Sequence, residues 1–372
     1  MLVARGELDE ALRIRLQEEL PVYEQLGDVR ERAVTLGKIA DVLAARGELD
    51  EAVRIRRDEE LPVYERLGDV RSRAVTLGKI ADVLIARGEL DEALRIRREE
   101  QLPVYERLGD VRSRAVTLGK IADVLTARGD LDGALRIRRE EQLPVYERLG
   151  DVRSRAITLG KIADVLTARG ELDEVLRIRR EDELPVYERL GDVRSRAVTL
   201  GQIADVLAAC GELDEALRIR REEALPVFER LGDVRERAIA VGKIADVLAA
   251  RGEFDEALRI RREEQLPVYE RLGDIRLRAI TLGKIADVLA ARGELDEALR
   301  IRREEELPVY ERLGDIRSRA VTLGQIAEGL AARGERDRAL AMWRESLDVF
   351  ERLGDPRLIE AARHKIAQLG LT

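Results

Sequence analysis

The chain has 372 residues, of which 38% are charged and only 3% aromatic, and its formal net charge is −8 at pH 7. The nearly balanced charges give no support to binding of nucleic acids or membranes, and no apolar run is long enough for a membrane-spanning helix. A single cysteine and a single histidine exclude an internal disulfide and a transition-metal site built from such residues. Because no signal peptide is recognised, we expect a cytoplasmic protein.

A sequence repeat of 41 residues, each copy of which we call a word, recurs along almost the whole chain. A clear copy, residues 69–109, reads DVRSRAVTLGKIADVLIARGELDEALRIRREEQLPVYERLG, and glycines such as Gly47, Gly88 and Gly129 recur 41 residues apart. A period this regular predicts a stacked array, in which each copy buries its apolar face against its neighbours. We therefore expect one elongated domain.

Each word predicts two antiparallel helices joined by short turns. Apolar residues recur every three or four positions over 70–86, which we name helix A, and over 90–108, which we name helix B. Asp69 is a suitable N-cap for helix A, and Gly88 can adopt the left-handed conformation that ends it. Because no alternating β pattern is present, the sequence predicts an all-α solenoid.

The predicted boundaries follow from the period. Residues 1–27 hold the end of a helix A and a complete helix B, so the apolar residues of this helix B lack part of their cover. We expect either that the chain is cut from a longer protein here or that this end associates with another copy, end to end. The eight words that follow are 28–68, 69–109, 110–150, 151–191, 192–232, 233–273, 274–314 and 315–354.

The last word and the segment after it differ from the rest. Residues 315–354 form a word of 40 residues that lacks the proline found in helix B of the others, such as Pro103. Residues 355–372 begin with Asp355 and Pro356, a strong helix start, and predict a capping helix with a polar face. We expect this to be a natural end of the array.

The repeated proline must be accommodated inside helix B, because a proline in a helix interior costs about 3 kcal/mol. The word without the proline is also the word that is one residue shorter. This coincidence favours an inserted residue that forms a local π-bulge and skips the amide that proline lacks. The alternative is a break at Pro103, which would open a short third helix.

A glycine inside helix A, Gly78 in the second word, also recurs and costs about 1 kcal/mol relative to alanine. We expect close packing against a neighbouring backbone there. The alternative is a flat groove floor for the backbone of a ligand.

The phrases LGKIADVL, RGELDEAL and ELPVYERLGD resemble the tetratricopeptide repeat, and most closely its long-helix subclass found in LGN/Pins polarity adaptors and kinesin light chains. Leu77, Ile80, Ala81 and Leu84 fall on that family's helix A packing positions. Arg97 departs from the pattern, because the family usually has a large apolar residue there. The resemblance implies a right-handed superhelix whose inner surface is lined by helix A and binds peptides or helices.

In that family the groove face of helix A carries the residue after the glycine and the one three positions further on. These residues are mostly lysine and aspartate, and they could form a repeated series, or ladder, that contacts a ligand. The alternative is that each Lys-Asp pair forms a solvated salt bridge within its own helix. For Arg97 we expect a buried stem and an acidic partner in the next word. The resemblance assigns these groove residues: Lys38, Asp41, Lys79, Asp82, Lys120, Asp123, Lys161, Asp164, Gln202, Asp205, Lys243, Asp246, Lys284, Asp287, Gln325 and Glu328.

We therefore expect a scaffold that binds a protein or an extended peptide, without a cofactor, a metal or catalytic activity. No Ser-His-Asp set and no Gly-rich phosphate loop is present, and His364 lies in the terminal cap. The alternative function is a sensor or regulatory domain of a larger bacterial signalling protein. Binding of RNA would require a basic groove and base-specific variation, and neither is seen.

Overall fold

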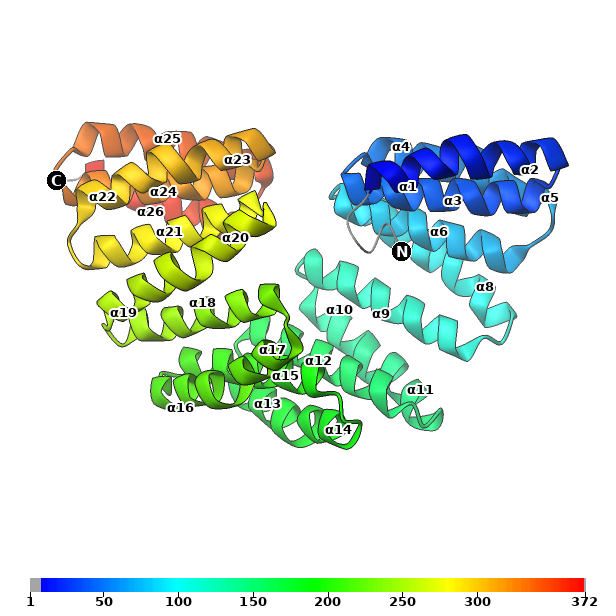
Figure 1. The fold of residues 1–372 in the computed structure, drawn as a ribbon, viewed down its shortest axis with the longest axis horizontal. Coiled ribbons are helices and arrows are strands. Elements are labelled where there is room, and N and C mark those ends of the chain that lie inside the picture. Colours follow the sequence, from blue (N-terminus) through cyan, green and yellow to red (C-terminus); the bar gives the residue numbers. More distant parts are fainter. Residues whose placement is uncertain (1–7, 371–372) are drawn as a thin grey trace. The chain divides into compact units, whose positions relative to one another are not determined.

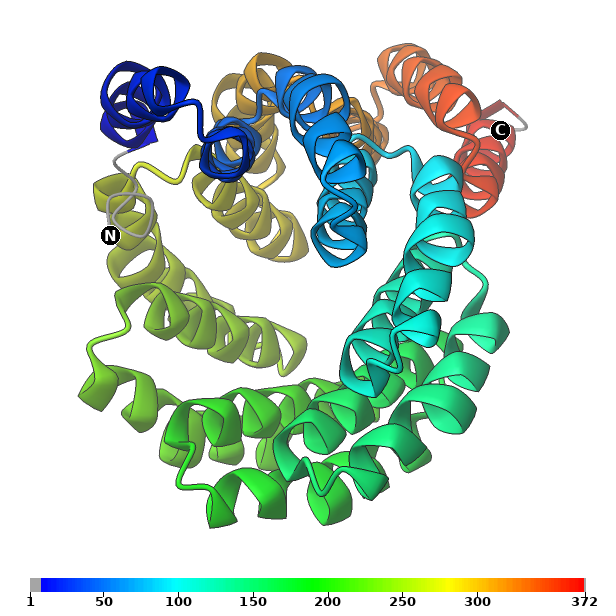
Figure 2. The same cartoon turned by 90° about the vertical axis from the view of Figure 1, so that its right-hand side faces the viewer.

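The computed structural model describes residues 8–370, and all regular structure in this range is helical. Of these residues, 8–186 form one compact unit and 187–370 a second. Within each unit the helix pairs follow one another in chain order (Figures 1 and 2). The all-α array of helix pairs is thus confirmed. The sequence does not predict the boundary between the two units, because this boundary falls inside helix α14 (Leu184–Arg189) and within a single word.

The A helices begin at an aspartate cap, as predicted. Asp69 Oδ1 accepts a hydrogen bond from the backbone N–H of Ser72 at 2.9 Å, and Gly88 after the helix has a φ of 83°. In the first unit these helices are α3 (Val29–Arg46), α6 (Val70–Ala86), α9 (Val111–Ala127) and α12 (Val152–Arg169). In the second unit they are α15 (Val193–Ala209), α18 (Val234–Ala250), α21 (Ile275–Ala291), α24 (Ile316–Ala332) and the closing helix α26 (Pro356–Gly370).

Most B helices consist of an α-helical part, a π-helical segment (η) and a second α-helical part. The first unit holds α1 (Leu8–Ile14), η2 (Arg15–Glu19) and α2 (Leu20–Leu26), then α4 (Leu49–Arg54), η3 (Ile55–Glu60) and α5 (Leu61–Arg66), then α7 (Leu90–Arg95), η4 (Ile96–Gln101) and α8 (Leu102–Arg107), then α10 (Leu131–Arg136), η5 (Ile137–Gln142) and α11 (Leu143–Arg148), then α13 (Leu172–Arg177) and η6 (Ile178–Glu183). The second unit holds α16 (Leu213–Arg218), η7 (Ile219–Ala224) and α17 (Leu225–Leu231), then α19 (Phe254–Arg259), η8 (Ile260–Gln265) and α20 (Leu266–Leu272), then α22 (Leu295–Ile301), η9 (Arg302–Glu306) and α23 (Leu307–Leu313), and finally α25 (Arg336–Leu353).

The π-helical segments explain how the chain accommodates its prolines. In η4 the N–H of Leu102 bonds the carbonyl of Arg97, five residues back, and Gln101 keeps right-handed helical angles. Helix B therefore continues through Pro103. The continuous helix with an inserted residue is confirmed, and the break at proline is wrong. Helix α25, from the word that lacks both the proline and the extra residue, is α-helical throughout.

The core confirms most of the predicted packing positions. Leu77, Ile80, Ala81 and Leu84 are buried in one cluster together with residues of the preceding and following helices. The expectation is wrong for Val70 and Leu108, which are 48% and 44% exposed. Both lie beside a turn between helix B and the next helix A, at the edge of the array, where less of the neighbouring repeat covers them.

The two ends of the described range differ as predicted. At the start, Val22 is 49% exposed, whereas the equivalent Val63 is 4% exposed, because helix A of the first word is missing beside Val22. The match of residues 2–5 to the end of a helix A lies outside the described residues, and end-to-end association stays a prediction. At the other end, α26 buries Ala362 against the last helix pair.

We predict that the proline is tolerated only where the extra residue is present. Replacing Asp348 in α25 with proline should lower the free energy of unfolding by about 3 kcal/mol, because this helix has no skipped amide. The reciprocal change, Pro308→Asp in the repeat before it, should alter this free energy by less than about 1 kcal/mol. Urea denaturation followed by circular dichroism measures both. Equal losses in the two variants would contradict the π-bulge explanation.

Candidate functional site

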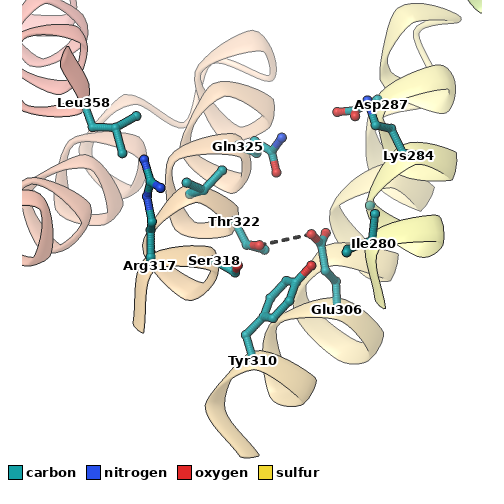
Figure 3. A pocket seen from close by; sticks show the side chains of 12 residues that line it. Ile280, Lys284, Asp287, Glu306, Tyr310, Arg317, Ser318, Thr322, Gln325 and Leu358 are labelled. Carbon is teal, nitrogen blue, oxygen red and sulfur yellow. Dashed lines mark hydrogen bonds between the residues drawn. The ribbon is translucent and has the colours of Figure 1, made fainter. Parts of the chain in front are cut away.

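The exposed side of the A helices carries the predicted groove residues. We call this surface the ladder face and define it by Val75, Lys79, Asp82 and their equivalents in the other words. A pocket of about 290 Å³ lies on it between α6 and α9, lined by Val75, Lys79, Gln101 and Val116 among others. The equivalent pocket in the second unit, of about 340 Å³, lies between α21 and α24 (Figure 3).

Each aspartate of the ladder face is held by a buried arginine from helix B of its own word. Arg97 is only 2% exposed, and its Nη2 donates to Asp82 Oδ1 at 2.6 Å and to the carbonyl of Gly78 at 3.3 Å. The expectation that Arg97 has a partner in the next word is therefore wrong. The same pair recurs as Arg56–Asp41, Arg138–Asp123, Arg179–Asp164, Arg220–Asp205, Arg261–Asp246 and Arg302–Asp287, at 2.5–2.7 Å.

The lysines mostly bridge neighbouring words instead of pairing within a helix. Lys79 Nζ lies 3.3 Å from Asp41 of the preceding word, and the same contact is formed by Lys120–Asp82 at 3.6 Å, Lys243–Asp205 at 3.1 Å and Lys284–Asp246 at 3.6 Å. Only Lys161, among the lysines described here, forms the pair within its own helix, with Asp164 at 3.6 Å. The prediction of a Lys-Asp salt bridge within each helix is thus wrong for most words. These half-exposed contacts contribute little to stability.

The remaining ladder residues lie at the same register. Lys38 is exposed on α3, and its backbone carbonyl accepts a hydrogen bond from Arg15. Gln202 is half-buried on α15, and Gln325 accepts a hydrogen bond from Arg302 Nη1 at 2.6 Å. Glu328 pairs with Lys365 of α26 at 2.9 Å. Trp343 stands at the arginine position of this last word.

A row of buried residues under the ladder face was not identified from the sequence. In six of the words, the last residue of the π-helical segment packs its side chain against the glycine of helix A: a Cβ added to Gly78 would lie 2.2 Å from Gln101 Nε2, and Gly37, Gly119, Gly160, Gly242 and Gly283 have equivalent contacts. The glycine therefore makes room for a side chain, and the expectation of a neighbouring backbone is wrong. The row consists of Glu60, Gln101, Gln142, Glu183, Ala224, Gln265 and Glu306, with Ser346 in the last word.

The hydrogen bonds of this row depend on whether an acid or an amide is present. Glu306 accepts a hydrogen bond from Thr322 Oγ1 at 3.1 Å (Figure 3). It accepts another from Arg302 Nη1, also at 3.1 Å. Beside Gln101, Thr117 instead donates to the carbonyl of Ser113 at 2.9 Å. Burial raises the pKa of the Glu306 carboxyl, and the same cause raises that of Glu60.

A raised pKa means that the folded protein holds the proton of Glu306 more tightly than the unfolded chain. Its contribution to stability is complete below the ordinary pKa of 4.5 and is lost as the pH rises through the raised value. We predict that Glu306→Gln raises the midpoint of thermal unfolding at neutral pH. The gain over the wild type should shrink as the pH falls toward 4.5, measured by calorimetry. A gain that is independent of pH would contradict this.

The two kinds of glycine position allow a matched test of packing. A Cβ on Gly242 would lie 2.0 Å from Gln265 Nε2, whereas a Cβ on Gly201 meets only Arg220 Nη1, at 3.9 Å. We predict that Gly242→Ala lowers the free energy of unfolding by about 1–2 kcal/mol, because it displaces a buried hydrogen-bonded amide. Gly201→Ala should raise it by up to about 1 kcal/mol. Denaturation of both variants checks this, and a gain from Gly242→Ala would refute it.

A protein-family model described as "Tetratricopeptide repeat" matches residues 40–58, 81–99, 197–222, 245–263, 286–304 and 320–345. Each segment begins within a helix A and ends in the following helix B. The chain is a tetratricopeptide repeat protein. None of the helices of this tetratricopeptide repeat protein within residues 8–370 has both the length and the apolar character needed to cross a membrane. A search of curated protein sequences finds no match.

Two solved structures share the fold at low sequence identity, and a third has a lower TM-score. The apo form of the quorum sensor NprR from B. thuringiensis is 13% identical, with a TM-score of 0.60 over 93% of this chain and 98% of that chain. A signal transduction ATPase with a tetratricopeptide repeat sensor, PH0952 from Pyrococcus horikoshii, is 15% identical, with a TM-score of 0.57 over 95% of this chain and 55% of that chain. A putative kinesin light chain from Podosopora anserina is 17% identical, with a TM-score of 0.45 over 54% of this chain and 96% of that chain.

Proposed function

We propose that this tetratricopeptide repeat protein binds an extended peptide along its ladder face and catalyses no reaction. The observation that carries the proposal is the recurrence, on this face, of apolar pocket walls beside a lysine and a fixed carboxylate. Val75 and Val116 are 49% and 50% exposed at the pocket between α6 and α9. Exposed apolar side chains in a hollow next to a few oriented polar groups are typical of a binding site.

The polar groups of the ladder face suit a peptide backbone. Asp82 Oδ1 is held by Arg97 at 2.6 Å, while no hydrogen bond of its Oδ2 is present among the described residues. This oxygen is therefore an oriented acceptor for a backbone N–H, and Lys120 beside it can donate to a carbonyl. Because the arginine immobilises the aspartate before binding, a ligand would lose less free energy in ordering it.

The charge balance of this face differs from that of the whole chain. In the words that carry both the arginine and the lysine, the buried arginine neutralises the aspartate, and the half-exposed lysine adds a positive charge; Gln202 and Gln325 replace this lysine in two words. The ladder face therefore favours an acidic segment, although the net charge of the chain is −8. We also propose that the protein lies in the cytoplasm. The same ladder face would serve a sensor domain of a larger signalling protein, which is the alternative function.

The proposal predicts that apolar residues of the ladder face determine the affinity for a peptide. Equally exposed apolar residues beside the turns at the edge of the array, such as Val70, should not affect it. Peptides would be selected from a displayed random library on the full chain, and their affinities measured by calorimetry. Changing Val75, Val116 and Ile157 together to lysine should weaken binding at least about tenfold, because each change removes apolar contact area.

The matched control changes the valines at the start of the same helices, Val70, Val111 and Val152, to lysine. These side chains are 45–48% exposed, similar to the ladder valines, but they are not among the residues that line the pocket between α6 and α9. Affinity should stay within about twofold of the wild type. Equal losses in the two triple variants, or no selected peptide at all, would overturn the proposal.

A further inference from the structure

One word of the array lacks the buried acid or amide. The last position of the π-helical segment is alanine at Ala224 but glutamate or glutamine in the other segments, at Glu19, Glu60, Gln101, Gln142, Glu183, Gln265 and Glu306. Two other polar groups are missing at the same place: Phe228 replaces the usual tyrosine, and Ala240 replaces the threonine of the next helix A. The three residues form one apolar cluster in the second unit, between α17 and α18 (Figure 1).

The side chain missing at Ala224 leaves a space beside Gly201. A Cβ on Gly201 would meet no atom nearer than Arg220 Nη1 at 3.9 Å, whereas a Cβ added to the equivalent glycine of any other complete word would lie within 3 Å of a side chain. Gly201 is also half-buried, while Gly78, Gly119 and Gly242 are buried. The space is therefore open to the ladder face and is not filled by the neighbouring residues.

The buried arginine of this word lacks one of its partners. Arg220 is 4% exposed, and its Nη2 donates to Asp205 at 2.6 Å and to the carbonyl of Gly201 at 3.1 Å. Its Nη1 has no hydrogen-bond partner among the described residues. In the other words this atom has an acceptor at the position of Ala224: Arg97 Nη1 donates to Gln101 at 3.1 Å, and Arg302 Nη1 to Glu306 at 3.1 Å.

We propose that the space beside Gly201 binds a carboxylate side chain of glutamate length, supplied by the ligand, with Arg220 Nη1 as its donor. The carboxylate would accept from Arg220 Nη1 as the carboxylate of Glu306, drawn in Figure 3, accepts from Arg302 Nη1. Arg220 and Lys243 carry two positive charges beside Asp205, and Asp246 of the next word, which also acts on Arg220, is itself paired with Arg261. Burial raises the pKa of Glu60 in the equivalent place, but Gly201 is half-buried and its space is open to the ladder face, so a carboxylate there would lose less of its hydration. The unpaired Nη1 of Arg220 then favours an anion over a neutral amide.

The source of the carboxylate is a glutamate of the extended peptide, and this part of the inference rests on the proposed function. In an array of nearly identical words, a peptide could bind in several registers with similar affinity. A single site that accepts an acidic side chain from outside would fix one register. The glutamate would occupy this site, and the residues on one side of it would lie on the word that follows in the second unit.

The proposed carboxylate site beside Gly201 is tested first without any peptide, by NMR on the full chain labelled with ¹⁵N-arginine. Propionate has the length of the glutamate side chain, and propionamide is its neutral counterpart. We expect propionate to shift the Nε–H resonance of Arg220, assigned with Arg220→Lys, in a saturable manner at millimolar concentration. Propionamide should bind at least about tenfold more weakly. In Ala224→Gln, which installs the native side chain of three other words, the propionate shift should be lost.

Two results would refute the proposed carboxylate site beside Gly201. One is that propionate causes no saturable shift of the Arg220 resonance in the wild type, and the other is that it causes the same shift in Ala224→Gln. The second would mean that propionate acts elsewhere on the protein. Because glutamine is accommodated beside Gly78, Gly119 and Gly242, Ala224→Gln should fold, and circular dichroism would verify this.

A second arm uses the peptides selected on the ladder face. Replacing their common glutamate with glutamine should weaken binding to the wild type about tenfold and leave binding to Ala224→Gln unchanged. Propionate binding without any selected peptide would refute the proposed function and support the pocket. Selected peptides that need no glutamate, together with no response to propionate, would refute the pocket and support the proposed function.

Discussion

The structure of every complete word except the last depends on one ion pair, between a buried arginine of helix B and a half-exposed aspartate of helix A. A buried guanidinium is tolerated only when acceptors surround it. In the second word these acceptors are Asp82, the carbonyl of Gly78 and the side chain of Gln101. The glycine is needed because the glutamine occupies the space that a Cβ would fill. One interaction thus accounts for four positions of the word, and it also orients the carboxylate that faces outward.

The inserted residue in helix B belongs to the same arrangement. Most π-helical segments begin near the buried arginine and end at the residue that accepts its hydrogen bond, as in η4, which starts with Ile96 and Arg97 and ends at Gln101. Segment η7, which ends at Ala224, is an exception, described above. The last word shows the reverse combination. It has Trp343 instead of the arginine, no inserted residue and no proline, and its helix α25 is α-helical throughout. The proline therefore marks words that contain the buried ion pair.

Local sequence signals predicted the fold well, because caps, glycines and apolar spacing act within one helix. The Asp69 cap, the turn at Gly88 and the π-bulge before Pro103 all depend on residues close in sequence. The pairings of Arg97 and Lys79 were predicted wrongly, because charged side chains of several carbons reach more than one partner, and the choice depends on how the helices pack. The buried row was detectable in principle. Its position alternates among glutamate, glutamine and alanine within a word that otherwise hardly changes, and Phe228 and Ala240 change together with Ala224.

The lysine contacts have a consequence for the gene. Lys79 bonds Asp41, and Lys120 lies near Asp82, so each word presents the same chemical surface to the word before it and the word after it. Recombination between two misaligned copies adds or removes whole words, and the new junction then joins surfaces that already match. A longer or shorter protein of this kind folds without compensating substitutions. A junction that places Ala240 after a word whose buried row holds Glu60 or Glu306 would lose the hydrogen bond from the threonine to that glutamate. The number of copies can therefore vary while the chemistry of most other interfaces stays constant.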